Sequence, residues 1–110
     1  RDFCFIDNCV QANILAASAT GPVAGEVFNV AFGQRTTLTE LFHLIRDEAA
    51  KFVPGCAQAQ PAYRDFRAGD VRHSLADISK SRGLLGYDPA WDVRQGLAQA
   101  GEWYARHLGA

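Results

Sequence analysis

The sequence has no methionine, only 4 prolines among its 110 residues, and no long unbroken run of hydrophobic side chains. A membrane-spanning helix needs about 18 or more consecutive apolar residues, so we expect no transmembrane segment. Hydrophobic residues still make up 48% of the chain, which is enough for one soluble domain with a buried core. Because the chain begins at Arg1 and lacks methionine, we expect it to be a piece of a longer polypeptide.

Neither sign of charge dominates the sequence. The 11 lysines and arginines nearly balance the 12 acidic residues, so the chain has no electrostatic footprint for nucleic acid or for an anionic membrane. The 3 cysteines are an odd number without Cys-x-x-Cys spacing, which predicts neither a disulfide framework nor a zinc site. We therefore expect no metal site. Residues 1–7 break the pattern of a secretory signal, so we expect a cytoplasmic protein.

The spacing of the apolar residues predicts a mostly helical chain. Residues 8–19 are apolar around most of a helix, which indicates a largely buried one, whereas the residues after Thr37 repeat at the interval of an amphipathic helix. Thr37 and Glu40 stand in the register of a capping box, which marks the start of that second helix. In order, the predicted elements are a helix at 8–19, a strand at 26–32, a helix after Thr37, a loop at 56–61, an extended piece at 62–66, a helix capped by Asp77 and ended by Gly86, and a helix capped by Asp92.

The predicted strand at 26–32 has no evident partner. It is apolar on both faces, which is typical of a parallel sheet covered by helices on both sides. One such strand cannot form a sheet by itself. We therefore expect an α/β fold in which this segment joins the edge of a sheet formed by residues that precede Arg1.

Charge is concentrated in residues 63–77, which contain three arginines and three aspartates. One interpretation is a solvated loop whose exposed ion pairs contribute less than about 1 kcal/mol each. The other is a phosphate clamp, because guanidinium groups bind phosphate oxygens in pairs and a carboxylate accepts hydrogen bonds from ribose hydroxyls. Gly69 allows the turn that would aim Arg67 and Asp70 at one ligand. The residues by themselves leave both interpretations open.

Three motifs occur in the order of a known family. Residues 1–8 read Arg-Asp-Phe-Cys-Phe-Ile-Asp-Asn, residues 29–33 read Asn-Val-Ala-Phe-Gly, and residues 67–80 carry Arg-x-Gly-Asp followed by Ser, Ala-Asp and Ser-Lys. Together these motifs resemble the C-terminal part of the extended short-chain dehydrogenase/reductase family, the NAD-dependent nucleotide-sugar epimerases and dehydratases. The resemblance covers residues 1–110. Within the family the amino-acid sequences of these motifs are most similar to those of bacterial UDP-N-acetylglucosamine 4-epimerases of polysaccharide biosynthesis.

The resemblance implies a UDP-sugar substrate and six residues that bind it. Two arginines would approach the diphosphate from opposite sides, an aspartate would hold the ribose hydroxyls, and a phenylalanine and a leucine would pack near the nucleoside. A serine would wall the sugar pocket where relatives restricted to glucose and galactose have tyrosine, which leaves room for an N-acetyl group. These substrate-binding residues are Arg1, Phe3, Leu38, Arg67, Asp70 and Ser74.

Other parts of the family's machinery are missing from the sequence. There is no Gly-rich turn of the kind that seats NAD and no Tyr-x-x-x-Lys. The resemblance therefore implies that NAD is bound mainly by a preceding Rossmann part, that no catalytic residue lies in this chain, and that this substrate-binding portion is inactive alone. It also implies a homodimer formed through helices that precede Arg1. The open alternatives are another member of the family, such as a UDP-uronic acid epimerase or a sugar-nucleotide dehydratase, and an interaction module without a ligand.

Overall fold

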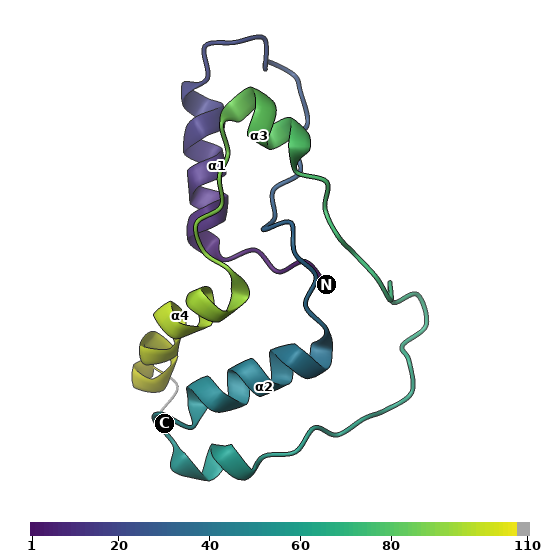
Figure 1. Ribbon diagram of the computed structural model, residues 1–110, viewed down its shortest axis with the longest axis vertical. Helices are drawn as coiled ribbons and strands as arrows, with labels where there is room; N and C mark the ends of the chain where they lie inside the picture. The colour runs from purple at the N-terminus through teal and green to yellow at the C-terminus, as the bar shows by residue number, and fades with distance from the viewer. Residues whose placement is uncertain (108–110) are drawn as a thin grey trace.

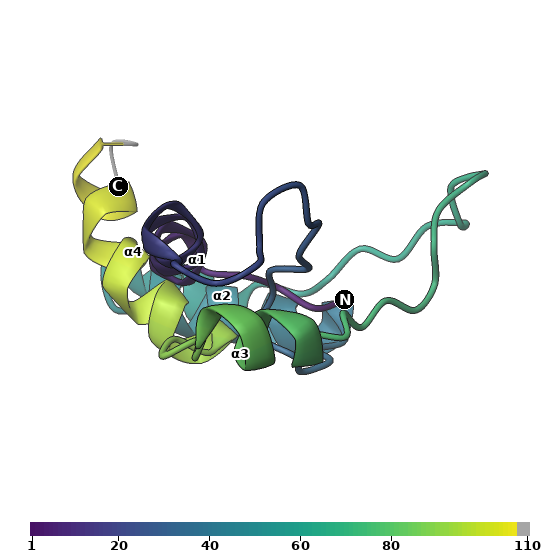
Figure 2. The same cartoon turned by 90° about the horizontal axis from the view of Figure 1, so that it is seen from above.

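The computed structural model describes residues 1–107. Its elements are α1 (Ile6–Ser18), α2 (Leu38–Ala49), the 3-10 helix η1 (Pro54–Gln58), α3 (Ser79–Leu85) and α4 (Val93–His107). Helix α1 packs against α3, and α2 packs against both η1 and α4, so the helices form two groups (Figure 1). The molecule is flat, with extents of 52 × 34 × 18 Å. Part of the segment between η1 and α3 projects from one side (Figure 2).

Helices α2 and α4 both begin with a capping box. At α2 the N–H of Glu40 donates to Thr37 Oγ1 at 3.1 Å, and the N–H of Thr37 donates to Glu40 Oε2 at 2.7 Å. At α4 the N–H of Gln95 donates to Asp92 Oδ1 at 2.7 Å, and the N–H of Asp92 donates to Gln95 Oε1 at 3.0 Å. Each box satisfies two amide donors that have no partner within the helix. Both predicted helix starts are therefore confirmed.

Helix α1 is less buried than the sequence predicts. Only Asn8 and Ala12 are buried, and Ile6, Val10 and Ile14 leave an exposed apolar stripe along the helix. The prediction of a largely buried helix is wrong for the described residues, because α3 covers one side of α1 and no described segment covers the stripe.

Two other predicted boundaries differ from the structure. The sequence predicts Asp77 as the cap of α3, but the helix begins at Ser79, whose N–H donates to Asp77 Oδ1 at 2.9 Å. Gly86 ends α3 in the left-handed conformation, with φ of 67°, as predicted. The predicted loop at 56–61 begins inside η1, because Pro54 at the start of η1 is already fixed at a helical φ.

The predicted strands at 26–32 and 62–66 are not present among residues 1–107. A strand exists only where a neighbouring segment supplies a ladder of main-chain hydrogen bonds, and no described segment supplies one. The helical part of the prediction is confirmed, and the described chain itself contains no sheet.

Side chains take the place of a ladder along one edge of segment 26–32. The three donors come from α3 and the residue after its cap, and they reach alternate carbonyls: Lys80 Nζ to Val27 O at 3.0 Å, Ser81 Oγ to Asn29 O, and Tyr87 Oη to Ala31 O at 2.8 Å. Alternate carbonyls share an edge only in an extended chain. Burial of the phenol raises the pKa of Tyr87, so it remains a hydrogen-bond donor.

The two helix groups meet at the start of α1. Asn8 is buried, its amide donates to Trp91 O at 2.7 Å, and its carbonyl accepts the N–H of Trp91 at 3.1 Å. Gly96 of α4 lies against the ring of Phe5, so close that a β-carbon there would be 2.7 Å from Phe5 Cδ2. These contacts connect α1 with the entry to α4. The small buried core beside them consists of Ala12, Ala31, Ile78, Leu85 and Tyr87.

Candidate functional site

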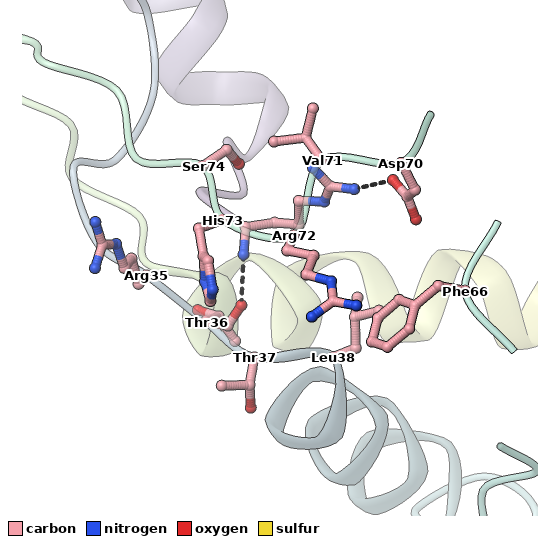
Figure 3. Close-up of a pocket in the computed structure, with 11 residues that line it drawn as sticks. Arg35, Thr36, Thr37, Leu38, Phe66, Asp70, Val71, Arg72, His73 and Ser74 are labelled. Atoms are coloured by element: carbon pink, nitrogen blue, oxygen red, sulfur yellow. Dashed lines mark hydrogen bonds and ion pairs between the residues drawn. The ribbon is translucent and has the colours of Figure 1, made fainter. Parts of the chain in front are cut away.

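One cavity has walls from three parts of the chain that are distant in sequence. Its volume is about 200 Å³, and its walls come from the N-terminal residue, the start of α2 and the charged segment before α3 (Figure 3). The lining residues are Arg1, Arg35, Thr36, Thr37, Leu38, Phe66, Asp70, Val71, Arg72, His73 and Ser74.

Main-chain hydrogen bonds fix Arg1 beside the start of α2. The amino group of Arg1 donates to Thr36 O at 2.8 Å, and the N–H of Thr36 donates to Arg1 O at 2.8 Å. This exchange is the pattern of a hydrogen-bonded pair in an antiparallel ladder. The capping box of Thr37 then directs α2 away from the cavity, which leaves Leu38 at its rim with 66% of its surface exposed.

An ion pair joins the first wall to the third. The guanidinium of Arg1 binds the carboxylate of Asp70, and the two side chains are 30% and 46% exposed. Asp70 follows a tight turn in which its N–H donates to Arg67 O at 3.1 Å and Gly69 adopts φ of 81°. A positive φ at the third position of such a turn favours glycine, so the predicted turn at Gly69 is confirmed.

Positive charge exceeds negative charge around the cavity. Arg72 is exposed, and its guanidinium carbon lies 4.2 Å from the centre of the Phe66 ring, which is a cation–π contact. Arg35 lies on the opposite side of the view from Phe66 (Figure 3). Together with Arg1, these residues give the cavity lining three arginines and one aspartate. Such an arrangement suits an anionic ligand.

Four of the six predicted substrate-binding residues line this cavity: Arg1, Leu38, Asp70 and Ser74. Phe3 and Arg67 are not among the lining residues. Phe3 is half-buried, and Arg67 is exposed immediately after Phe66, which does line the cavity.

Several lining residues are not among the six that the sequence predicts to bind substrate. Arg72 and His73 lie inside the charged stretch, so its composition held a signal for them. Arg35 stands alone between the predicted strand and the helix, and only the fold brings it to the site. The sequence predicts Phe66 only as part of an extended piece. In the structure its side chain is 74% exposed and lines the cavity.

The described residues do not fit a dinucleotide or a metal ion. No group of three histidine, cysteine or acidic side chains in residues 1–107 could hold a metal. Of the glycines before helices, Gly33 is packed, since a β-carbon there would be 3.1 Å from Ile78 Cδ1, and no Gly-rich turn opens a helix. None of the helices in this range is long and apolar enough to cross a membrane.

A larger cavity lies elsewhere but has different chemistry. It is an apolar groove of about 500 Å³ between α2, η1 and α4. Glu48 is the one ionised side chain of its lining among the described residues, and no cation lines it. The groove therefore offers nothing to a phosphate group, and the smaller cavity is the candidate site.

The chain was compared with known proteins, and no family model matches it. It is 35% identical over 108 residues to the dTDP-L-rhamnose 4-epimerase of Burkholderia thailandensis, covering 98% of this chain and 28% of that enzyme. It is 31% identical over 104 residues to the UDP-glucose 4-epimerase of Mycolicibacterium smegmatis, covering 94% of this chain and 31% of the relative. Other curated relatives are named dTDP-glucose 4,6-dehydratase.

A solved structure matches almost the whole chain. The UDP-glucuronic acid 4-epimerase of Bacillus cereus, a mutant in complex with UDP-4-deoxy-4-fluoro-glucuronic acid and NAD, superposes with a TM-score of 0.70 at 26% identity. The match covers 98% of this chain and 32% of that one. The chain thus spans just under a third of the length of the proteins it matches and is similar there to sugar-nucleotide 4-epimerases.

Proposed function

We propose that this chain belongs to the NAD-dependent sugar-nucleotide epimerase and dehydratase family and is the C-terminal substrate-binding portion of a UDP-sugar 4-epimerase. The observation that carries the proposal is the cavity in which Arg1 and Asp70, 69 positions apart, meet beside the start of α2. The end-to-end similarity to 4-epimerases supports it independently. A loop of solvated charges would not require these distant groups to meet.

The site would bind the nucleotide by exchanging partners. In the free chain Arg1 and Asp70 neutralise each other. A diphosphate offers the guanidinium of Arg1 a bidentate partner, and the released Asp70 carboxylate can accept hydrogen bonds from ribose hydroxyls. Arg67, on the other side of the turn at Gly69, would approach the diphosphate from the opposite side, while Leu38 supplies apolar contact for the nucleoside.

Ser74 is proposed to select the sugar. Its side chain lines the cavity and is small, so space remains there for an N-acetyl group. We expect Ser74→Tyr in the full-length protein to abolish turnover of the N-acetylated UDP-sugar by steric clash and to spare UDP-glucose. Ser74→Ala, which keeps the space and removes only the hydroxyl, should accept both sugars. Equal kinetics of Ser74→Tyr on the two substrates would refute this role.

The free edge of segment 26–32 supports the proposed position of the remaining protein. The N–H and C=O groups of Phe28 and Val30 face away from α3 and have no hydrogen-bond partner among residues 1–107. The exposed stripe of α1 lies on the face of that helix opposite Ala12, the α1 residue that shares the buried core with Ala31 of this segment. We propose that preceding residues form a sheet that pairs with that edge and provides the NAD site, that other preceding residues cover the stripe, and that this chain is therefore inactive alone.

A second candidate reaction is favoured by one comparison. The superposed solved structure is a UDP-glucuronic acid 4-epimerase. Arg35 and Arg72 give this cavity more cationic groups than a diphosphate and a neutral sugar require, and a sugar carboxylate would use one of them.

Turnover of a substrate panel tests the proposed function. Full-length protein is incubated with NAD and, separately, with UDP-N-acetylglucosamine, UDP-glucose and UDP-glucuronic acid, and the sugar configuration is followed by proton NMR. We expect 4-epimerisation of the N-acetylated sugar or of UDP-glucose. Epimerisation of the uronate alone would replace the main proposal by the second candidate. Absence of turnover together with absence of UDP binding would indicate an interaction module.

A further inference from the structure

The carboxylate of Asp2 gathers main-chain donors from two distant segments. It accepts the N–H of Phe32 at 3.2 Å, the N–H of Gly33 at 3.1 Å, and the N–H of Ala76 at 3.2 Å. A carboxylate has acceptor sites for about four hydrogen bonds. Asp2 therefore uses most of its capacity on backbone groups 30 to 74 residues away.

The chain changes direction at Gly33, the second of two adjacent residues whose N–H groups donate to Asp2. Successive N–H groups of an extended chain point to opposite sides, so one carboxylate cannot normally bind both. The N–H groups of Phe32 and Gly33 nevertheless both reach Asp2, and Gly33, with φ of 84°, turns the chain directly after these two donors. A side chain at this position would also meet Ile78 at 3.1 Å. Gly33 and the Asp2 carboxylate thus fix the backbone together at this turn.

The segment that carries Asp2 and the two segments that it binds lead directly to the three walls of the cavity. Asp2 follows Arg1, Gly33 precedes the Arg35–Leu38 wall, and Ala76 stands two residues after Ser74. Asp2 itself is not among the residues that line the cavity. Any effect on a ligand must therefore pass through the residues whose backbone it holds.

We propose that Asp2 is a positioning residue that fixes the distance between Ser74 and the start of α2, and thereby sets which sugar nucleotides the site accepts. The inference rests on the proposed function. Charged acceptors hold N–H groups more tightly than neutral ones, so the carboxylate confines the Ser74 wall, which is otherwise attached to the long projecting segment. Without it, that wall moves and the space beside the sugar is no longer defined.

The test compares two variants of the full-length protein. Asp2→Asn keeps the size of the side chain but presents an NH₂ group to backbone N–H donors, so at least one hydrogen bond is lost. Asp92→Ala removes the cap of α4, whose hydrogen bonds go to Gln95 and not to Asp2 or its three donors, and controls for general destabilisation. We expect Asp2→Asn to raise KM at least tenfold with kcat changed less than threefold, and to shift the preference between UDP-N-acetylglucosamine and UDP-glucose. Asp92→Ala should leave the preference unchanged.

Hydrogen exchange separates this inference from the proposed function. In Asp2→Asn the amides of Gly33 and Ala76 should exchange at least tenfold faster, whereas in Asp92→Ala faster exchange should be confined to the start of α4. Unchanged exchange at Ala76 overturns the inference whatever the activity. Faster exchange with wild-type KM and wild-type preference overturns it as well. A wild-type protein that neither binds nor converts a sugar nucleotide overturns the proposed function, and the selectivity role of Asp2 falls with it.

Discussion

Glycine at position 96 is required by the contact between α4 and the start of α1. A β-carbon there would lie 2.7 Å from Phe5 Cδ2 and 2.8 Å from Phe5 Cγ, both well inside contact distance. The Phe5 ring cannot easily move, because it also packs on Trp91 at a centroid distance of 5.8 Å. Gly83 in α3 is the opposite case, since a β-carbon there meets nothing within 4 Å.

These two glycines give a matched pair of substitutions. We expect Gly96→Ala to destabilise the protein by about 1–3 kcal/mol through overpacking. Gly83→Ala should stabilise it by about 0.5–1 kcal/mol, because alanine loses less conformational entropy in a helix. Urea midpoints of the full-length variants measure both. Equal midpoints for the two variants would contradict the described packing of Phe5.

Individual site residues were predictable from the sequence only where a motif marked them. The motifs identified Arg1, Asp70 and Ser74, which line the cavity, and Gly69, whose turn is confirmed. Arg35 could not be found in this way, because an isolated arginine carries no local pattern and reaches the cavity only through the fold. The predicted substrate-binding roles of all six residues remain predictions.

At the scale of elements, the cap of α2 makes a pH-dependent contribution to stability. The backbone N–H of Thr37, followed by its hydroxyl, lowers the pKa of Glu40 from its ordinary value of 4.5. A carboxylate whose pKa is lowered in the folded state stabilises that state above the unfolded pKa and loses the contribution as pH falls through the folded pKa. The contribution of Glu40 is thus present at neutral pH and disappears below about pH 4.5.

The melting temperature as a function of pH tests this contribution. Glu40→Gln should melt below wild type at pH 7, and the gap should close as the pH is lowered from 4.5 toward 3. The α4 box offers a control, because its third helical residue is the neutral Gln95. Gln95→Ala should lower the melting temperature by an amount that changes little over the same range. A gap for Glu40→Gln that persists at pH 3 would contradict the ionic nature of the cap.

Helices were predictable from the sequence because their signals are local. Capping boxes and apolar periodicity lie within one element, and the starts of α2 and α4 are where they indicate. The predicted strand at 26–32 failed within the described residues because a strand depends on a neighbour far away in sequence. Its alternate carbonyls do share one edge, as in a strand, but side chains of Lys80, Ser81 and Tyr87 occupy it.

The whole molecule buries little of its apolar surface. Its smallest extent is 18 Å, its buried core is small, and large side chains are exposed on α1, where Ile6 and Ile14 are 64% and 63% exposed. Exposed apolar surface of this kind marks either an interaction face or an aggregation hazard. We propose that the α1 stripe contacts the rest of a longer protein.

A charge placed in the α1 stripe tests whether the stripe is exposed in residues 1–110 alone and covered in the full-length protein. Residues 1–110 expressed alone should aggregate and bind a hydrophobic dye, and Ile14→Lys should reduce both effects. In the full-length protein the same change should lower the melting temperature, since the charged lysine would be buried against the preceding residues proposed to cover the stripe. Gln99, an exposed position on α4, provides the control as Gln99→Lys. Full-length Ile14→Lys with a wild-type melting temperature would show that nothing covers the stripe.

Calorimetric titration of the full-length protein with UDP determines whether this cavity binds the diphosphate. Wild type is compared with Arg1→Ala, with Arg67→Ala, and with Arg106→Ala, whose exposed arginine on α4 pairs with Glu102 outside the cavity. Losing a charged hydrogen bond to phosphate costs about 1.5–3 kcal/mol, so each of the first two variants should bind UDP about tenfold or more weakly. Arg106→Ala should bind as wild type does. If Arg1→Ala and Arg67→Ala also retain wild-type affinity, the cavity does not hold the diphosphate and the account is wrong.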